Sequence, residues 1–209
     1  MSWNGYSSQN EQHAFLSPSK VSWIRYSEEE LYSAYIRSFS PAIGTALHEL
    51  AHDLIVKCVT LSKADRKMVL FHLLENDIPR VAIDMNALYP NFMAYVNDSL
   101  MYGLTPEVKL QYSDVCFGHA DAVGFENNLL RIFDLKTGTT PAHMEQLMIY
   151  AALFCLQNKI KPATIQTELR LYQGGNVQVV SPDWKDIYEF TQIIIKNSNY
   201  IQKISEKGV

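Results

Sequence analysis

The first half of the chain has its hydrophobic residues spaced as in amphipathic helices. After Ser40-Pro41, apolar side chains recur every three or four residues, and we expect a helix over residues 42–60. Ser40 would be its N-cap and Pro41 its first helical residue. Ser62 and Asp65, three residues apart, match the capping box that begins a helix. Residues 16–20 offer a cap before a short predicted helix that ends at Tyr26, and the other helices predicted in this half cover residues 27–38, 42–60, 62–75 and 84–103, the last with a break near Pro90.

After Gly103 the pattern changes to short runs bounded by turn residues, which is typical of β-strands. Gly174-Gly175 predicts a tight hairpin turn. Thr140-Pro141 and Ser181-Pro182 each offer a cap and a helical proline. The order of elements predicts an α/β domain with a central mixed β-sheet flanked by α-helices and a helical N-terminal part. The predicted strands cover residues 107–112, 116–125, 129–136, 164–173 and 176–180, with helices over residues 140–158 and from 181 towards 204.

Composition predicts one domain behind a short lead. Residues 1–16 are rich in Ser, Asn and Gln and are expected to be a flexible N-terminal lead, followed by a single domain over residues 17–209. No apolar run approaches the roughly 20 residues that a membrane span needs, and the polar N-terminus does not resemble a signal peptide. We therefore expect a cytoplasmic protein without a membrane partner.

Charge and cysteine usage narrow the function classes. The net charge of −4 argues against a basic platform for tight non-specific DNA binding, but it allows an enzyme that meets DNA through a local groove and metal ions. Cys58, Cys116 and Cys155 lie far apart inside apolar segments and form no CxxC pair. We expect them to be buried reduced thiols rather than metal ligands.

The segment Asp134-Leu135-Lys136-Thr137-Gly138 follows an apolar run that predicts a strand. Side chains alternate along a strand, so Asp134 and Lys136 lie on one face. One group can hold a divalent metal while the other stabilises a nucleophile or developing negative charge. Taken without their context, these residues are better explained as a structural ion pair at a strand end.

A second motif, His48-Glu49-Leu50-Ala51-His52, matches the HExxH pattern of zinc peptidases. Two histidines four residues apart lie on one helical face and can share a zinc ion, with Glu49 as general base on the bound water. A third protein ligand is required, and Glu75 is the nearest candidate by spacing. The alternative is that Glu49 and His52 lie on a partly solvated helix face.

Four motifs occur in a defined order along the chain. They are Gly44-x-x-x-His48, Gly118-x-x-Asp121, Asp134-x-Lys136-Thr137-Gly138 and Gln146-x-x-x-Tyr150. This ordered set resembles the RecB-like branch of the PD-(D/E)xK nuclease superfamily, including phage-encoded and CRISPR-associated exonucleases. The segment Ser17-Pro18-Ser19-Lys20 is also similar to the serine-rich opening of that branch. The resemblance spans roughly residues 16–171 and implies a restriction-endonuclease-like core.

The resemblance implies a role for each matching residue. His48, Asp121 and Asp134, with the Leu135 backbone carbonyl, would bind Mg²⁺ or Mn²⁺, and Asp121, Asp134 and Lys136 would be catalytic. Gln146, Tyr150 and Thr137 would contact the substrate, and Glu107 would be an additional acid. Several relatives carry four cysteines that bind an iron–sulfur cluster; this chain has no such set, so we expect no cluster.

The implied function is a divalent-metal-dependent DNA nuclease, with exonuclease favoured over endonuclease action. Phage or prophage DNA recombination, repair or processing is the expected setting, with a recombination or helicase partner. Two alternatives stay open: a zinc metallopeptidase that uses His48, Glu49 and His52, and a catalytically silent nucleic-acid-binding module of the same fold.

Overall fold

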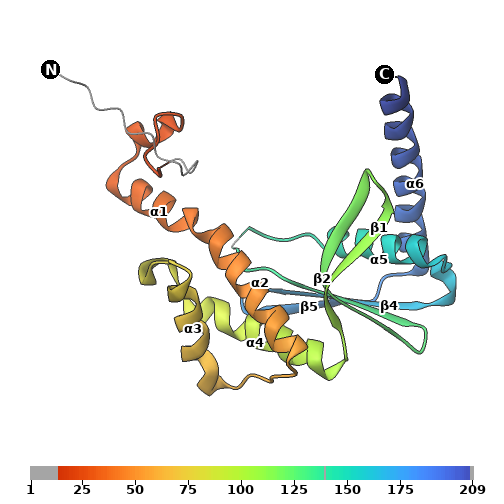
Figure 1. Cartoon of the computed structure of the whole chain (residues 1–209), viewed down its shortest axis with the longest axis horizontal. Helices are drawn as coiled ribbons and strands as arrows, with labels where there is room; N and C mark the ends of the chain where they lie inside the picture. The colour runs from red at the N-terminus through yellow and green to blue at the C-terminus, as the bar shows by residue number, and fades with distance from the viewer. Residues whose placement is uncertain (1–13, 139, 208–209) are drawn as a thin grey trace.

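The computed structural model describes residues 14–138 and 140–207. Within this part of the chain, five strands form one mixed sheet with helices on both faces (Figure 1), as the sequence predicts. Most of the predicted flexible lead lies outside the described residues, which begin at residue 14; the Phe15 ring contacts that of Tyr35, with 5.2 Å between the centroids. Among the described residues, no helix is long and apolar enough to cross a membrane.

Local capping signals position the N-terminal helices. The Ser27 hydroxyl accepts the Glu30 N–H and the Glu30 carboxylate accepts the Ser27 N–H, and Ser62 and Asp65 pair in a similar box. The short helix predicted to end at Tyr26 is present as a 3₁₀ helix over Val21–Arg25. The elements are η1 Val21–Arg25, α1 Glu28–Ser38, α2 Ser40–Val56, η2 Lys63–Asp65, α3 Arg66–Glu75, η3 Arg80–Ala82 and α4 Met85–Met101.

Helix α4 corrects the predicted break near Pro90. The helix runs through Pro90 without interruption. A proline inside a helix costs about 3 kcal/mol because it removes one backbone hydrogen bond and crowds the preceding turn. The same helix buries Tyr89, Phe92 and Tyr95, and each large apolar side chain contributes about 1.5–3 kcal/mol on burial. Burial on this one helix therefore outweighs the cost of the proline.

The sheet has the order β1-β2-β3-β4-β5, and β3 and β4 are its parallel pair. The crossover between these two strands contains α5, and α6 follows the final hairpin. Gly174 and Gly175 have φ of +60° and +81°, which the predicted hairpin turn requires. The elements are β1 Thr105–Ser113, β2 Cys116–Glu126, β3 Leu129–Leu135, α5 Glu145–Asn158, η4 Pro162–Thr164, β4 Gln166–Gln173, β5 Asn176–Val180 and α6 Trp184–Lys207.

Three predicted helix starts are wrong by one to five residues. Helix α2 begins at Ser40 itself, with Phe39 at the N-cap position. Helix α5 begins at Glu145 instead of near Thr140-Pro141, because Ala142 is hydrogen-bonded to a distant strand residue. In α6 the cap is Asp183 rather than Ser181: the Asp183 carboxylate accepts the Lys185 N–H at 2.9 Å.

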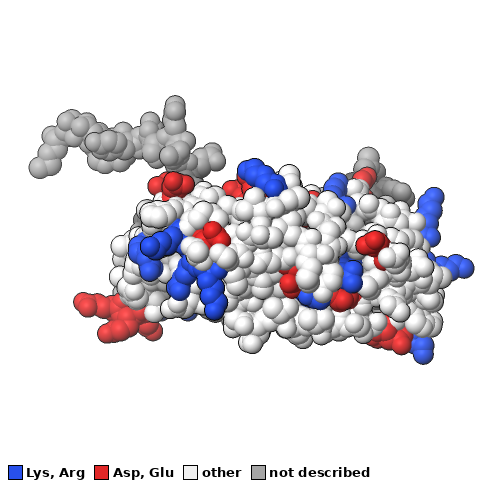
Figure 2. All heavy atoms as spheres, turned by 90° about the horizontal axis from the view of Figure 1, so that it is seen from below, with Lys and Arg blue, Asp and Glu red and all other residues white. Residues whose placement is uncertain are grey.

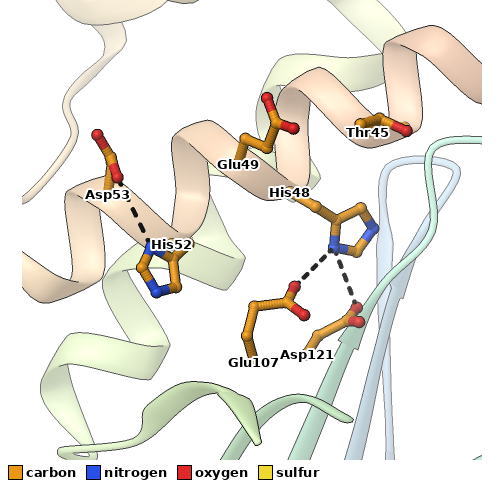
Figure 3. A pocket seen from close by; sticks show the side chains of 8 residues that line it. Thr45, His48, Glu49, His52, Asp53, Glu107 and Asp121 are labelled. Carbon is orange, nitrogen blue, oxygen red and sulfur yellow. Dashed lines mark ion pairs between the residues drawn. The ribbon is translucent and has the colours of Figure 1, made fainter. Parts of the chain in front are cut away.

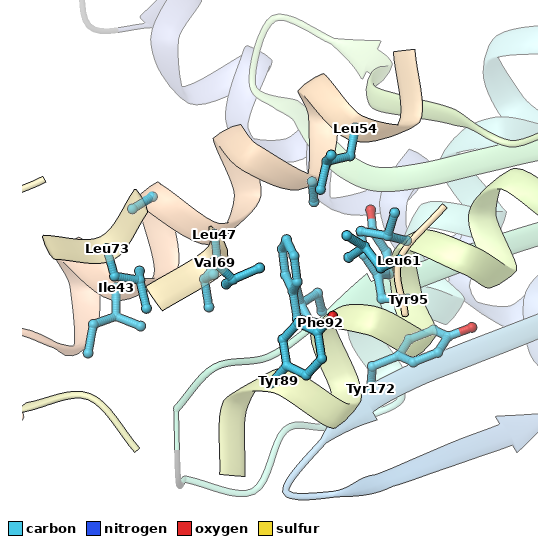
Figure 4. Close-up of a cluster of buried hydrophobic side chains, with 14 of the residues drawn as sticks. Ile43, Leu47, Leu54, Leu61, Val69, Leu73, Tyr89, Phe92, Tyr95 and Tyr172 are labelled. Atoms are coloured by element: carbon cyan, nitrogen blue, oxygen red, sulfur yellow. The ribbon is translucent and has the colours of Figure 1, made fainter. Parts of the chain in front are cut away.

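Two hydrophobic clusters cover the two faces of the sheet. Residues from α2, α3 and α4 pack on the face that carries Phe133, Leu135 and Tyr172 (Figure 4). Residues from α5 and α6 pack on the opposite face, against Leu130 and Ile132. Alternate positions of β3 thus point to opposite clusters, as period two requires. The end of β3 lies between the layers, and α2 crosses the sheet near it.

A polar network anchors α4 to β4. The Arg170 guanidinium donates to the Asp98 carboxylate at 2.8 Å and to the Tyr102 hydroxyl at 2.9 Å. The Tyr172 hydroxyl donates to the same carboxylate at 2.8 Å, and burial with this hydrogen bond raises the pKa of Tyr172 well above its usual value. Each buried polar group in the network therefore has a partner, which lets charge persist next to the core.

The three cysteines differ in their exposure to solvent. Cys155 is buried and Cys116 is half-buried, whereas Cys58 is exposed, so the expectation of three buried thiols is wrong for Cys58. Cys58 lies in the turn that ends α2, with φ of +55°, beyond the buried stripe of the helix. On the face shown in Figure 2, basic and acidic side chains are interspersed across largely uncharged surface.

Candidate metal centre

The centre of α2 presents His48 to the kinked part of strands β1 and β2 (Figure 3). The His48 Nδ1 atom lies 3.6 Å from Asp121 Oδ2 and 4.0 Å from Glu107 Oε1. One ligand atom from each of the three residues lies within 4.8 Å of the others. Helix α2 and the β1–β2 hairpin, which are distant from each other in the sequence, thus bring one imidazole and two carboxylates close together.

Glu107 has an unusual backbone conformation for a strand residue. Its φ is +52°, a region that residues other than glycine rarely adopt. The flanking pairs Pro106↔Ala122 and Val108↔Ala120 place it opposite Asp121. Ala120 and Ala122 pack into different hydrophobic clusters, although a regular strand would point both to the same face. The hairpin therefore kinks at Glu107 and Asp121, and Figure 3 shows both carboxylates directed towards His48.

Asp121 is a largely enclosed carboxylate, with 15% of its side chain exposed, and its pKa is shifted. Its Oδ2 atom accepts the backbone N–H of Leu135 at 2.8 Å. Burial and the neighbouring negative charge of Asp134 raise the pKa of Asp121 from 3.8 to about 7, although His48, the Leu135 N–H and Lys136 act in the opposite direction. A nearby cation would favour the ionised form. Without one, ionised Asp121 is under electrostatic strain.

Asp134 and Lys136 form the ion pair that period-two alternation predicts. Asp134 is 1% exposed at the end of β3, and the Lys136 ammonium donates to its Oδ1 at 3.0 Å. The second oxygen, Oδ2, lies 2.8 Å from the same ammonium but accepts no hydrogen bond of good geometry from the described residues. Asp134 lies outside the three-residue group of His48, Glu107 and Asp121. Its buried Oδ2 nevertheless keeps an open acceptor position beside that group.

Two glycines explain why the four sequence motifs fit together. A Cβ atom on Gly44 would lie 3.3 Å from Thr137 Oγ1, so α2 approaches the loop that follows Lys136 closely. A Cβ atom on Gly118 would lie 3.0 Å from the Tyr150 ring, so β2 approaches α5 equally closely. The histidine motif therefore packs on the lysine motif, and the Gly118-x-x-Asp121 motif packs on the Gln146-x-x-x-Tyr150 motif.

The residues predicted to contact substrate differ in exposure. Gln146 is exposed in the first turn of α5. Tyr150 is half-buried, and its hydroxyl donates to the His119 carbonyl oxygen at 2.7 Å. Thr137 lies against Gly44. The tyrosine hydroxyl is thus used to hold β2, while the Gln146 side chain is open to solvent.

The HExxH residues lie on one side of a single cavity but do not form one cluster. A cavity of about 700 Å³ is lined by His48, Glu49 and His52 of α2, together with Glu107 and Asp121. His52 Nδ1 lies 3.6 Å from Asp53 Oδ1, directed away from His48 in Figure 3. Glu75, the spacing-based candidate for a third zinc ligand, is exposed at the end of α3. The metal-capable group among the described residues includes neither His52 nor Glu75.

Comparison with known proteins adds no assignment to this geometry. None of the protein-family models searched matches the sequence, and no curated protein matches it. The chemistry of the site is therefore interpreted from the residues of this chain.

Proposed function

We propose that this chain is a divalent-metal-dependent deoxyribonuclease that hydrolyses phosphodiester bonds. The observation that carries the proposal is the meeting of His48, Glu107 and Asp121 beside the Asp134–Lys136 pair. Carboxylate oxygens, which make up two of the three donors, are the ligands that Mg²⁺ and Mn²⁺ prefer. An ammonium group next to such a centre is suited to an anionic substrate.

The donor set fits a bound cation. Asp121, whose side chain is 15% exposed, lies near the buried Asp134, and Asp134 Oδ2 accepts no hydrogen bond of good geometry from the described residues although the Lys136 ammonium is 2.8 Å away. Buried charge without full pairing is costly, and a cation would offset that cost. His48, Glu107 and Asp121 would hold the ion, and the Asp134 carboxylate and the Leu135 carbonyl are further ligands in the hypothesis. When bound, Mg²⁺ or Mn²⁺ would polarise the phosphate and lower the pKa of a water molecule.

Lys136 supplies a positive charge beside the carboxylates of the centre. Its side chain is 29% exposed and is held by Asp134, so its ammonium is both oriented and accessible. In the proposal it stabilises the negative charge that develops on the phosphate during hydrolysis. Gln146 and Thr137 lie on elements next to the centre, where they would contact the DNA strand.

DNA as the substrate is supported by the order of the four motifs, which resembles that of the RecB-like nucleases. The same resemblance supports exonuclease over endonuclease action, a cytoplasmic role in phage or prophage DNA processing, and a recombination or helicase partner. The net charge of −4 is consistent with contacts confined to a local groove.

The test is cleavage of end-labelled linear and circular DNA with Mg²⁺ or Mn²⁺. Lys136→Met should lower the rate by roughly 10²–10³-fold, the usual cost of removing one preorganised electrostatic group. His52→Ala is the matched control, because His52 lies on the same helix and in the same cavity but outside the three-residue group; it should retain activity.

Three other results would count against the proposal. Absence of cleavage of single-stranded, double-stranded and branched DNA with either metal would favour the silent binding module. Loss of activity in His52→Ala, together with one tightly bound zinc ion, would favour a metallopeptidase. Wild-type cleavage by Lys136→Met would remove the lysine from the mechanism.

A further inference from the structure

The loop that follows β3 carries Lys136 and Thr137 from the strand end towards α5. Its first residue is held by the sheet, since the Lys136 N–H donates to the Tyr172 carbonyl at 2.9 Å and so extends the β3–β4 pairing by one residue. Beyond Lys136 the chain leaves the ladder, and its backbone groups need other partners. Three of these backbone groups, on Gly138, Thr140 and Ala142, are hydrogen-bonded to the side chain of Gln173.

Gln173 is the last residue of β4, and its amide bonds to the loop at three places. The Nε2 atom donates to the Gly138 carbonyl at 2.9 Å and to the Thr140 carbonyl at 2.7 Å. The Oε1 atom accepts the Ala142 N–H at 3.0 Å. A carboxamide can make this set because it carries two donor hydrogens and an acceptor oxygen on one planar group, whereas a carboxylate has acceptors alone.

Gln173 is itself held from the core. The Asn91 side chain of α4 is 4% exposed; it donates to the Asn176 carbonyl at 2.7 Å and accepts the Gly175 N–H. These bonds fix the turn that immediately follows Gln173. A continuous series of hydrogen bonds therefore leads from buried α4, through the β4–β5 turn, to the loop that carries Lys136.

The loop has space to move if this connection is lost. A cavity of about 350 Å³ lies beside it, lined by Asn91, Lys136, Thr137, Gly138 and Gln173. On its other side Thr137 contacts α2 at Gly44, with no Cβ between them. The loop after β3 is thus held between Gln173 on one side and α2 on the other.

We propose that Gln173 is a positioning residue that fixes the loop after β3 and thereby places the Lys136 ammonium for phosphodiester hydrolysis. This inference rests on the proposed nuclease function. The Gln173 side chain bonds to the loop backbone and to none of the proposed metal ligands. Removing this side chain therefore changes the position of Lys136 and leaves the metal-binding residues in place. A displacement of about 1 Å in a catalytic group costs on the order of 10²-fold in rate.

The kinetic test compares Gln173→Ala with Gln178→Ala. Gln178 is an exposed glutamine on the adjacent strand, opposite Leu171, and serves as the matched control. Gln173→Ala should lower kcat by roughly 10–10²-fold while KM and the Kd for Mn²⁺ stay within about 2-fold of wild type. Gln173→Glu keeps the acceptor for Ala142 but loses both donors, so it should also lower kcat.

Hydrogen–deuterium exchange of the full-length, metal-free protein tests the loop without any activity assay. The Ala142 amide should exchange faster in Gln173→Ala than in Gln178→Ala, while α2 remains protected, because that amide loses its acceptor. Unchanged exchange at Ala142, or a kcat equal to that of Gln178→Ala, would overturn the proposal. If the wild-type protein cleaves no DNA, the nuclease assignment fails, and the exchange result alone still decides whether Gln173 holds the loop.

Discussion

Replacing Asp121 by Asn should stabilise the metal-free protein at alkaline pH while removing its metal affinity. Burial and the charge of Asp134 raise the pKa of Asp121 from 3.8 to about 7. A group whose pKa is higher in the folded than in the unfolded state favours folding most fully below the unfolded pKa. This contribution is lost as pH rises through the folded pKa. For Asp121 the window therefore runs from about pH 4 to just above pH 7.

The size of the effect follows from the two pKa values. The difference, 7 − 3.8, corresponds to an upper limit of about 4 kcal/mol at about 1.4 kcal/mol per pKa unit. The Asp121 side chain is 15% exposed, so solvent screening reduces the value, and we expect roughly 2–4 kcal/mol at pH 8. Asparagine keeps an oxygen that can accept the Leu135 N–H, so the substitution removes the charge and preserves the hydrogen bond.

Urea or thermal unfolding with a chelator at pH 5 and pH 8 measures this difference. Asp121→Asn should be more stable than wild type at pH 8, by roughly 2–4 °C in Tm per kcal/mol for a chain of this size, and the gap should narrow at pH 5. Added Mn²⁺ should raise the Tm of wild type and leave the variant unchanged. Glu126→Gln, which removes an exposed charge from the same strand, is the control. Equal or lower stability of Asp121→Asn at pH 8 would refute the electrostatic reasoning.

Two further substitutions test the packing around the centre and the fold. Gly118→Ala places a Cβ 3.0 Å from the Tyr150 ring and should lower the free energy of unfolding in urea by about 1–3 kcal/mol. The control is Gly138→Ala, whose Cβ would have no described atom within 4 Å and which should change that free energy by less than about 0.5 kcal/mol. Equal effects of the two substitutions would show that the close approach of Gly118 to Tyr150 does not matter. Arg170→Met leaves the Asp98 carboxylate without its cation and should destabilise the fold by about 3 kcal/mol, while the affinity for Mn²⁺ stays unchanged. A loss of Mn²⁺ affinity would contradict the separation of the Arg170–Asp98 network from the metal centre.

The elements that sequence predicts well are those set by local chemistry. The capping boxes of Ser27 and Ser62 each use atoms within three residues, so the helix starts that depend on them are predicted from sequence alone. The starts of α5 and α6 are missed for different reasons. Ala142 is held by Gln173, 31 residues away, which no local pattern can indicate, whereas Asp183 is a local cap that competes with Ser181 two residues earlier. Pro90 is misjudged because burial of α4 outweighs a local cost.

The candidate site shows the same division. His48 and Asp121 lie close together in the structure, as the sequence predicts, and Asp134 pairs with Lys136 on one strand face. The position of Glu107 next to His48 and Asp121 depends on its φ of +52°, and a glutamate in the sequence does not indicate this backbone conformation. The resemblance implies Glu107 only as an additional acid, and its position opposite Asp121 depends on a register shift between Gln111 and Ser113 that the sequence does not indicate. The roles of His48, Asp121, Asp134 and the Leu135 carbonyl as metal ligands stay predictions.

The most direct test of the metal centre is the anomalous diffraction of a crystal soaked in Mn²⁺. We expect one peak in contact with His48, Glu107 and Asp121, absent from the same crystal form of His48→Ala and unaffected in His52→Ala. The position of the peak also reports whether the Asp134 carboxylate lies within bonding distance of the ion. A peak shared by His48 and His52, or no peak at His48 at saturating Mn²⁺, would contradict the assignment of this centre.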